Sequence, residues 1–316
     1  MRPPRRTGEK AAPARNLRVC RCNLKKHMND SAVLLIDCPD RKGLVARVSG
    51  LLYERGANIL HADQHIDHES GLFFMRVEWA LNGGESGAAG FDLEAFKAAF
   101  APPARELGMR WTLSESGRRP RVALFCSHYL HCVADLLYRW RTGELRCEIP
   151  LIVSNHRAVE ELASFYGVPF EHTPVTAATR AEAERRQMEL LAAHRIDLIV
   201  LARYMQILSP SFVAQYPAGI INVHHSFLPA FTGARPYHAA HERGVKLIGA
   251  TSHYVTEVLD DGPIIEQDVA RISHRDQVED LVARGRDLER MVLSRAVRWH
   301  LDRRILCYGN KTVVFD

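Results

Sequence analysis

Residues 220–229 read Ile-Ile-Asn-Val-His-His-Ser-Phe-Leu-Pro, an apolar run that leads into polar side chains and a proline. Asn222 and His224 lie two residues apart, so on a strand they project from the same side. The turn that follows would leave both at the carboxyl edge of a sheet, where open α/β folds place their ligand sites. Downstream, residues 258–263 add a carboxylate, Asp260, beside a Gly-Pro turn. Together the three side chains could supply an oxyanion donor, a proton carrier and a base.

The sequence around this stretch alternates between apolar runs and amphipathic segments. The runs predict strands at 121–126, 149–154, 168–172, 197–202, 219–224, 247–255 and 264–270. Helical spacing predicts helices at 131–141, 157–166 and 180–194, then a long helix near 276–303. Residues 305–315, around Gly309-Asn310, predict a closing hairpin. This order favours a Rossmann-like, mostly parallel sheet that is covered on both faces.

The N-terminal third has a different order of elements. Its pattern predicts strands at 33–37, 59–66, 73–81 and 109–113, with helices at 44–53 and 93–107. The order βαββαβ is ferredoxin-like. Residues 114–120 are polar and rich in turn-forming residues, so we expect a linker between a domain at 31–113 and a second domain at 121–316.

The charge of the chain is unevenly distributed. Of the net charge of +5, residues 1–27 contribute +8, which leaves −3 for the rest and gives little support to nucleic-acid binding. Residues 1–30 are expected to be a basic, unstructured leader; they lack the apolar core of a secretory signal. A mis-called start before Met28 and an organelle-targeting segment are both open interpretations. No apolar run is long enough to span a bilayer, so we expect no membrane partner.

Seven cysteines without a disulfide-like framework suit a reducing cytoplasm, where we expect the protein to be located. Four side chains within residues 126–132 could be metal ligands, although a strand end and a helix start explain them as well. They are Cys126, His128, His131 and Cys132. A second group of histidines could form a metal site or a pH switch, but alternate positions on a half-exposed strand also carry histidine. They are His61, His65 and His68. We expect no metal.

The N-terminal segment resembles an ACT domain, a small regulatory module that often binds amino acids. The resemblance is carried by residues 37–44 (Asp-Cys-Pro-Asp-Arg-Lys-Gly-Leu) and 56–59 (Gly-Ala-Asn-Ile). Ligands of that family lie where backbone N–H groups of such a turn meet a helix N-terminus, a natural carboxylate site. The resemblance implies an amino-acid effector at Asp40, Arg41, Lys42, Gly43 and Leu44. Many ACT domains only dimerise, so pairing without an effector is the alternative, and a homo-oligomer with an even number of chains is expected.

The remainder resembles folate-dependent formyltransferases and formyl hydrolases over nearly its whole length. Besides residues 222–229 and 259–264, the match is carried by 202–208 (Ala-Arg-Tyr-Met-Gln-Ile-Leu) and 249–255 (Gly-Ala-Thr-Ser-His-Tyr-Val). The resemblance places Asn222, His224 and Asp260 at the family's catalytic positions and implies no cofactor, because the folate is a substrate. The residues that it implies for binding this substrate are Met205, Gln206, Leu208, His253, Thr256 and Val258.

Physical roles for the three catalytic candidates follow from the chemistry of a formyl group on an aromatic-type amide nitrogen. Asn222 would donate to the developing oxyanion, a contribution of about 10²–10³ in rate. His224 could donate to the same oxygen or carry a proton to the leaving nitrogen. Asp260 would orient His224 and the attacking water and accept its proton. His225 and His253 are secondary candidates for hydrogen-bond support.

The loop after the first strand of the second domain bears on what receives the formyl group. A ribonucleotide acceptor needs a glycine-rich loop to cradle its phosphate, whereas residues 127–132 (Ser-His-Tyr-Leu-His-Cys) contain no glycine. Water is then the natural acceptor. An ACT domain ahead of such a domain resembles the formyltetrahydrofolate deformylase family, which also shares residues 131–132, 135–140 and 154–156. His128 departs from the basic residue expected at its position.

The resemblance implies hydrolysis of 10-formyltetrahydrofolate to tetrahydrofolate and formate, and thus a role in purine and one-carbon metabolism. A formyltransferase for an amine acceptor is one alternative, but such relatives carry an additional C-terminal domain, for which little chain remains after residue 270. A non-catalytic folate-binding regulator is another, although such a protein would not need Asn222, His224 and Asp260 together.

Overall fold

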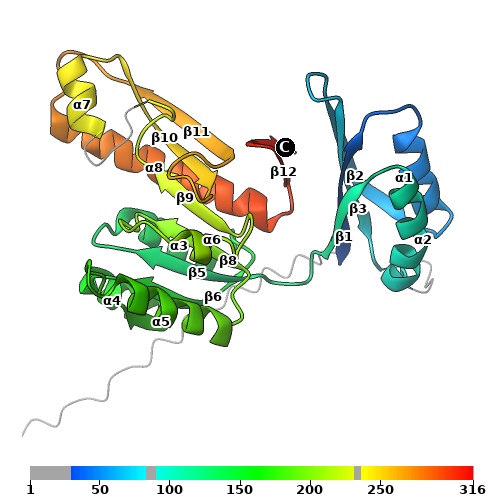
Figure 1. Ribbon diagram of the computed structural model, residues 1–316, viewed down its shortest axis with the longest axis horizontal. Coiled ribbons are helices and arrows are strands. Elements are labelled where there is room, and N and C mark those ends of the chain that lie inside the picture. Colours follow the sequence, from blue (N-terminus) through cyan, green and yellow to red (C-terminus); the bar gives the residue numbers. More distant parts are fainter. Residues whose placement is uncertain (1–29, 83–89, 231–235, 316) are drawn as a thin grey trace, which may run out of the picture.

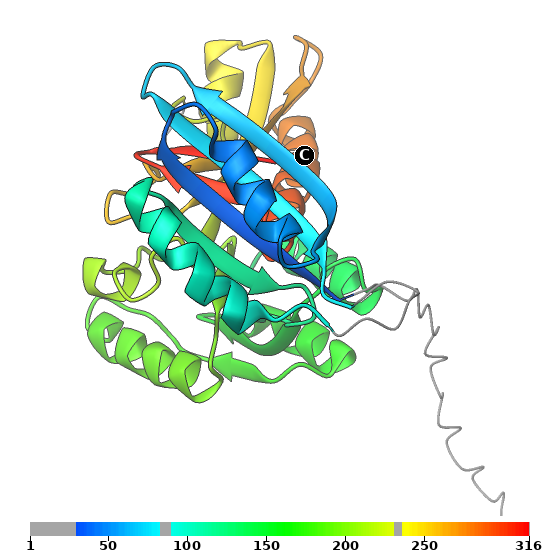
Figure 2. The ribbon, with the colours of Figure 1, turned by 90° about the vertical axis from the view of Figure 1, so that its right-hand side faces the viewer.

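The computed structural model describes residues 30–82, 90–230 and 236–315, so the predicted leader, apart from Asp30, lies outside the described residues. Figure 1 shows two lobes with a short hairpin near the C-terminus between them. Figure 2 looks onto the smaller lobe and shows that its two helices cover the side of the sheet that faces away from the larger lobe. Among the helices formed by the described residues, none is long and apolar enough to cross a membrane.

The smaller lobe has the predicted βαββαβ order. Its elements are β1 (Ser31–Pro39), α1 (Leu44–Tyr53), β2 (Asn58–Asp67), β3 (Leu72–Ala80), α2 (Leu93–Glu106) and β4 (Arg110–Glu115). The four strands pair antiparallel in the order β2-β3-β1-β4. Trp79, Phe96 and Phe100 fill the core between sheet and helices and are almost completely buried. Because β1 is buried at eight of its nine residues, the opposite face of the sheet must also be covered.

The larger lobe is built on a seven-stranded sheet in the order β11-β10-β9-β8-β5-β6-β7. Strands β5 to β9 are parallel, whereas β10 and β11 run antiparallel, which confirms the mostly parallel sheet. The strands are β5 (Arg121–Cys126), β6 (Glu148–Ser154), β7 (Phe170–His172), β8 (Leu198–Ala202), β9 (Ile220–His224), β10 (Leu247–Tyr254) and β11 (Ile264–Arg271). The helices are α3 (His131–Arg141), η1 (Arg157–Val159), α4 (Glu160–Tyr166), α5 (Arg180–Ala193), α6 (Pro210–Val213), α7 (Pro236–Arg243) and α8 (Val278–Leu301).

A few elements differ from the sequence prediction. The predicted helix at 157–166 begins as the 3-10 turn η1, and β4 extends to Glu115, into the predicted linker. The short helices α6 and α7 were not predicted, because four and eight residues are too few for a helical period to repeat clearly. The start of α6 nevertheless has a recognisable signal: Ser209 caps it through the N–H of Phe212, and Pro210 follows.

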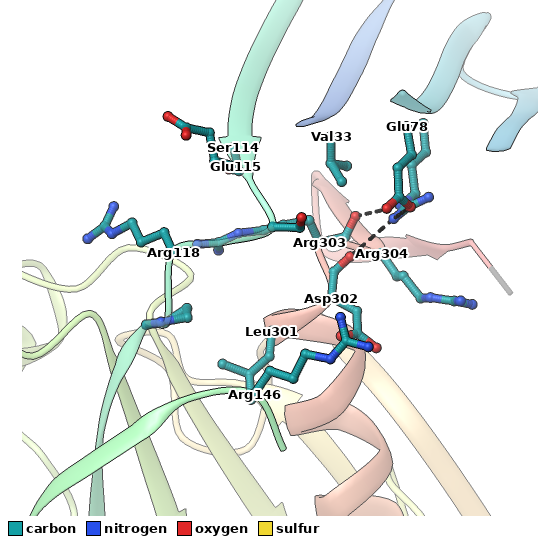
Figure 3. A pocket seen from close by; sticks show the side chains of 13 residues that line it. Val33, Glu78, Ser114, Glu115, Arg118, Arg146, Leu301, Asp302, Arg303 and Arg304 are labelled. Carbon is teal, nitrogen blue, oxygen red and sulfur yellow. Dashed lines mark hydrogen bonds and ion pairs between the residues drawn. The ribbon is translucent and has the colours of Figure 1, made fainter. Parts of the chain in front are cut away.

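Helix α8 connects the two lobes. It begins with a capping box, in which Gln277 and Asp280 each bond the other's backbone, and it packs on β9, β10 and β11. At its C-terminal end, Arg76 of β3 donates from Nε to the carbonyl of Arg303 (3.0 Å) and from Nη2 to that of Asp302 (3.3 Å) (Figure 3). The side chain of Arg76 is buried and is also paired with Glu78 at 2.8 Å. The smaller sheet therefore holds the end of α8 directly.

The chain then forms the predicted closing hairpin, β12 (Ile305–Tyr308) and β13 (Lys311–Val314). This hairpin covers the open face of the smaller sheet. Val313 and Phe315 are buried against Val33, Leu35 and Phe74 in a separate apolar cluster. This contact explains why β1 is buried on both faces.

Candidate active site

Strand β9 carries the first two site residues. Asn222 and His224 occupy alternate positions at its end and pair in register with His253 and Thr251 of β10. The loop beyond β9 is held by Thr251, whose hydroxyl donates to the carbonyl of Ser226 (2.8 Å) and accepts from the N–H of Leu228 (3.1 Å). A buried strand end and a well-bonded loop thus fix the amide and the imidazole on one side of the sheet.

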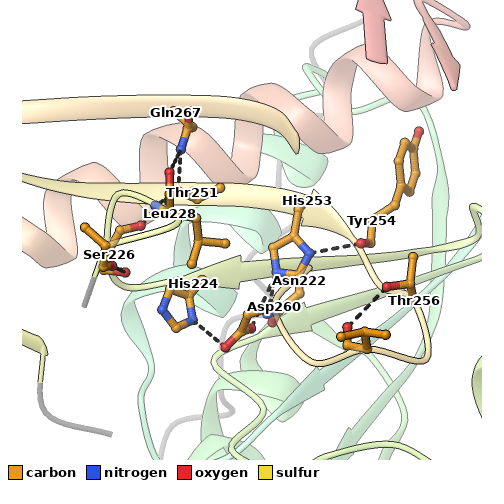
Figure 4. Close-up of polar contacts among 12 residues, drawn as sticks. Asn222, His224, Ser226, Leu228, Thr251, His253, Tyr254, Thr256, Asp260 and Gln267 are labelled. Carbon is orange, nitrogen blue, oxygen red and sulfur yellow. Dashed lines mark hydrogen bonds and ion pairs between the residues drawn. The ribbon is translucent and has the colours of Figure 1, made fainter. Parts of the chain in front are cut away.

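Asp260 comes from the loop that joins β10 to β11. Its φ of +54° lies in the left-handed region, which is strained for a residue with a side chain. The next turn is tight, because a Cβ at Gly262 would lie 1.8 Å from the carbonyl oxygen of Tyr254. This backbone places the Asp260 carboxylate 3.2 Å from His224 Nδ1 and 3.7 Å from His253 Nε2 (Figure 4).

Hydrogen bonds assign the tautomer of His253. Its Nδ1 lies 2.9 Å from the carbonyl oxygen of Tyr254, which can only accept, so Nδ1 carries the proton. Its Nε2 faces two groups, the Asn222 amide nitrogen at 3.2 Å and Asp260 Oδ1 at 3.7 Å. The Asn222 amide nitrogen thus lies beside His253 on the wall of the site, where it can donate to a ligand.

The electrostatics keep Asp260 ionised. Burial raises the pKa of its carboxyl, but the hydrogen bonds and charges of His224 and His253 outweigh burial and hold the pKa well below the usual value. An ionised carboxylate facing Nδ1 favours the tautomer of His224 that keeps its proton on that nitrogen. Nε2, which has no hydrogen-bond partner among the described residues, is then the nitrogen left for a ligand.

These residues line a cavity of about 540 Å³, large enough for a small organic ligand. All nine residues that the sequence predicted for catalysis and substrate binding lie on its wall: Met205, Gln206, Leu208, Asn222, His224, His253, Thr256, Val258 and Asp260. His225 also lines it. Residues 205–208 and 255–260 come from two loops at the same sheet edge, so the cavity lies where the strand order predicts.

Arg203 is a wall residue that the sequence analysis did not single out. Its φ of +62° is left-handed, and its guanidinium lies over the Tyr129 ring, 4.7 Å from the centroid. Nε is 3.5 Å from the carboxylate of Glu289, a buried residue of α8 that also accepts from Tyr237 and pairs with His131, each at 2.7 Å. Burial raises the pKa of the Glu289 carboxyl. The hydrogen bond from His131 and the charge of Arg203 lower this pKa by more than burial raises it, so the carboxylate is ionised.

Other predicted candidates lie away from this cavity. Residues 40–43 form the turn before α1 and Leu44 begins the helix; Gly43 is left-handed at φ +89°, and only Leu44 of the five is buried. His61, His65 and His68 are exposed on or next to β2. Of the histidines and cysteines at 126–132, the described residues bring only His131 and Cys132 together, with Glu289 as a third potential ligand. The bond from His131 to Glu289 accounts for that group without an ion.

Comparison with known proteins agrees with this geometry. Residues 120–297 match the formyl transferase family and residues 32–89 the ACT domain family. The chain is 53% identical over 289 residues to a formyltetrahydrofolate deformylase from Synechocystis sp., covering 91% of this chain and 99% of the relative. A second deformylase, from Bacillus subtilis, is 49% identical over 288 residues, 91% of this chain and 94% of the relative.

A crystal structure extends the likeness to three dimensions. The formyltetrahydrofolate deformylase from Pseudomonas syringae pv. tomato superposes with a TM-score of 0.88 at 48% identity, covering 93% of this chain and 97% of that one. Both lobes are included in these matches, so the likeness is not limited to one shared domain. The chain therefore belongs to the formyltetrahydrofolate deformylase family.

Proposed function

We propose that this chain hydrolyses 10-formyltetrahydrofolate to tetrahydrofolate and formate, with Asn222, His224 and Asp260 as the catalytic residues. The observation that carries the proposal is their convergence: Asp260 lies 3.2 Å from His224 on the wall of one cavity, which Asn222 also lines. A histidine oriented by a carboxylate, beside an amide donor, fits acyl transfer to water.

In the proposed reaction a water oxygen attacks the formyl carbon. The Asn222 amide donates to the carbonyl oxygen as it gains negative charge, which is worth about 10²–10³ in rate. The water proton enters the His224–Asp260 pair, and His224 Nε2 delivers a proton to the leaving nitrogen as the C–N bond breaks. One water is consumed, the nitrogen gains a hydrogen, and formate leaves with release of a proton.

The depressed pKa of Asp260 refines its role in this scheme. A carboxylate with so low a pKa is a weak base, so its main contribution is to orient His224 and to stabilise the imidazolium that forms. The second contact, to His253, fixes the other carboxylate oxygen and connects Asp260 to Asn222. We propose that Asp260 orients both the imidazole and the attacking water.

Water as the acceptor is supported by the loop after β5. The rings of His128 and Tyr129 lie against each other with centroids 4.1 Å apart and planes tilted by 41°, and Arg203 lies over Tyr129. Ser127 accepts from the N–H of Met205 (3.0 Å), so this loop is tied to the loop at residues 205–208. Bulky side chains here oppose the close backbone approach that a phosphate-bearing acceptor requires.

Substrate binding is proposed to use the two loops around the cavity. Met205, Leu208 and Val258 provide apolar contact for the pterin ring, while Gln206, His253 and Thr256 provide polar groups at its edge. The apolar side chains at the rim are partly open: Met205 is 41% exposed and Val258 61% exposed. A planar ring would bury this surface on binding.

The smaller lobe is proposed to regulate the larger one. Helix α1 begins at Leu44 and its first turn contains no acidic residue, so the backbone N–H groups at its N-terminus favour a carboxylate ligand. We propose domains at residues 31–113 and 121–316, an even-numbered homo-oligomer and a cytoplasmic location. The described cysteines are free thiols, which suits a reducing compartment.

The direct test is formate release from 10-formyltetrahydrofolate, measured with the full chain and no acceptor present. Equal amounts of formate and tetrahydrofolate should accumulate over many turnovers. If tetrahydrofolate appears only after an amine is added, together with the formylated amine and without formate, the chain is a transferase and the proposal is wrong.

A further inference from the structure

The loop that carries Asp260 has few bonds of its own. Within it, Thr256 Oγ1 donates to the carbonyl of Val258 at 3.2 Å, and the N–H of Asp261 reaches that carbonyl only at 3.5 Å. Val258 and Leu259 are each 61% exposed, so the loop has no apolar anchor near its tip. A left-handed Asp260 is therefore held in place by contacts from outside the loop.

Two of these outside contacts come from the C-terminal hairpin. Asn310 Nδ2 donates to the carbonyl of Asp261 at 2.7 Å, and Thr312 Oγ1 donates to the carbonyl of Ile264 at 2.6 Å. The two bonds bracket the tight turn at Gly262-Pro263. The first fixes the peptide plane that directly follows Asp261, one residue from the carboxylate that faces His224.

The hairpin in turn depends on the smaller lobe for its position. Its strands have four residues each, and such a hairpin is only marginally stable on its own. Tyr308 packs on Phe74 of β3 with ring centroids 4.6 Å apart, and Val313 is 9% exposed in the same cluster. The ion pair of Lys311 with Glu69, in the turn between β2 and β3, is exposed and contributes little to this position.

We infer that Asn310 is a positioning residue for catalysis: it sets Asp260 through the Asp261 carbonyl and transmits the position of the smaller sheet to the active site. The inference rests on the proposed function and deepens it by naming the route of regulation. A ligand that moves the β1–β3 face relative to α8 would move the hairpin and with it the carboxylate partner of His224. Arg76 donates hydrogen bonds to the carbonyls of Asp302 and Arg303, just before the hairpin, and therefore lies on the same route (Figure 3).

The test compares variants within a single turn of the hairpin. Asn310→Ala should lower kcat for formate release by about ten- to a hundredfold, since a displacement of about 1 Å at a catalytic group has effects of this size. KM should stay within twofold, because the side chain does not line the cavity. Lys311→Ala, the neighbouring exposed position, is the matched control and should retain kcat within twofold.

A second comparison separates positioning from folding. Asn310→Asp keeps the shape but turns the donor into an acceptor, so its kcat should be at least as low as that of Asn310→Ala, with an unchanged melting temperature. Thr312→Val removes the second bond at nearly constant volume and should lower kcat too, even if Asn310 variants unfold. Tyr308→Leu should lower kcat in the wild-type background but not further in Asn310→Ala.

Two results would overturn the inference: kcat within twofold of wild type in Asn310→Ala, or equal effects of Tyr308→Leu in both backgrounds. A wild-type chain that releases no formate would refute the proposed function and this inference with it. An active wild type with an equally active Asn310→Ala refutes the inference alone.

Discussion

Substitution of Gly262 by alanine tests whether the backbone of the catalytic loop sets the position of Asp260. A Cβ at this position would lie 1.8 Å from the carbonyl oxygen and 2.9 Å from the carbonyl carbon of Tyr254, whereas ordinary contacts begin at 3.4 Å. Both obstructing atoms are backbone of β10, and the N–H of Tyr254 already donates to the Pro263 carbonyl at 2.9 Å. Because β10 is packed in the sheet, the added Cβ would displace the loop between β10 and β11 by roughly 1.5 Å. A displacement of this size is enough to separate Asp260 from His224.

Gly262→Ala should therefore lower kcat for formate release by about a hundredfold or more and reduce the free energy of unfolding by about 1–3 kcal/mol. Formate release gives the first value and urea denaturation the second. Gly50→Ala in α1 is the matched control: no atom of the described residues lies within 4 Å of its added Cβ, so it should keep wild-type kcat and gain up to about 1 kcal/mol from helix propensity. Wild-type kcat and stability in Gly262→Ala would refute the reasoning.

Two further predictions concern substrate binding and pH. Met205→Ala removes a half-exposed side chain from the cavity wall. The lost contact with the substrate, about 1 kcal/mol, should raise KM several-fold and leave kcat unchanged. A fall in kcat at constant KM would contradict a binding role for Met205. Burial, then the charge of Arg303, lowers the pKa of His300 from 6.5 to about 4. The neutral ring therefore contributes stability that is complete above pH 6.5 and is lost as pH falls toward 4, by roughly 2 kcal/mol after screening of the half-buried ring. Urea titrations at several pH values should show this slope in wild type and a shallower one in His300→Gln.

The sequence predicted the parts of the site that depend on local pattern. Asn222 and His224 share a strand, and the alternation of a strand puts them on one face without knowledge of the rest of the fold. Met205 and Leu208 were implied by the family resemblance, and they follow the end of β8, where the edge rule for parallel sheets places a ligand site. Asp260 needed the family resemblance, because its left-handed backbone and its contact with His224 have no signal in a stretch of Asp-Asp-Gly-Pro.

The parts that were missed depend on contacts between distant segments. Arg203 reads as a polar residue after a strand, yet a left-handed turn directs it to the cavity wall and to Glu289, 86 positions later in the chain. Glu289 itself reads as part of the solvated face of a long helix. The hairpin was predicted from Gly309-Asn310, but nothing local indicates that it would pack on Phe74 of the smaller sheet and reach Asp261.

The most direct test of the account compares Asp260→Ala with Asp261→Ala, its exposed neighbour. The account predicts that Asp260→Ala lowers kcat for formate release from 10-formyltetrahydrofolate by about 10²–10⁴-fold while tetrahydrofolate still binds with a Kd near that of wild type. Asp261→Ala, whose backbone contacts remain, should stay within a few-fold of wild type. Equal rates of formate release in Asp260→Ala and wild type would contradict the proposed mechanism.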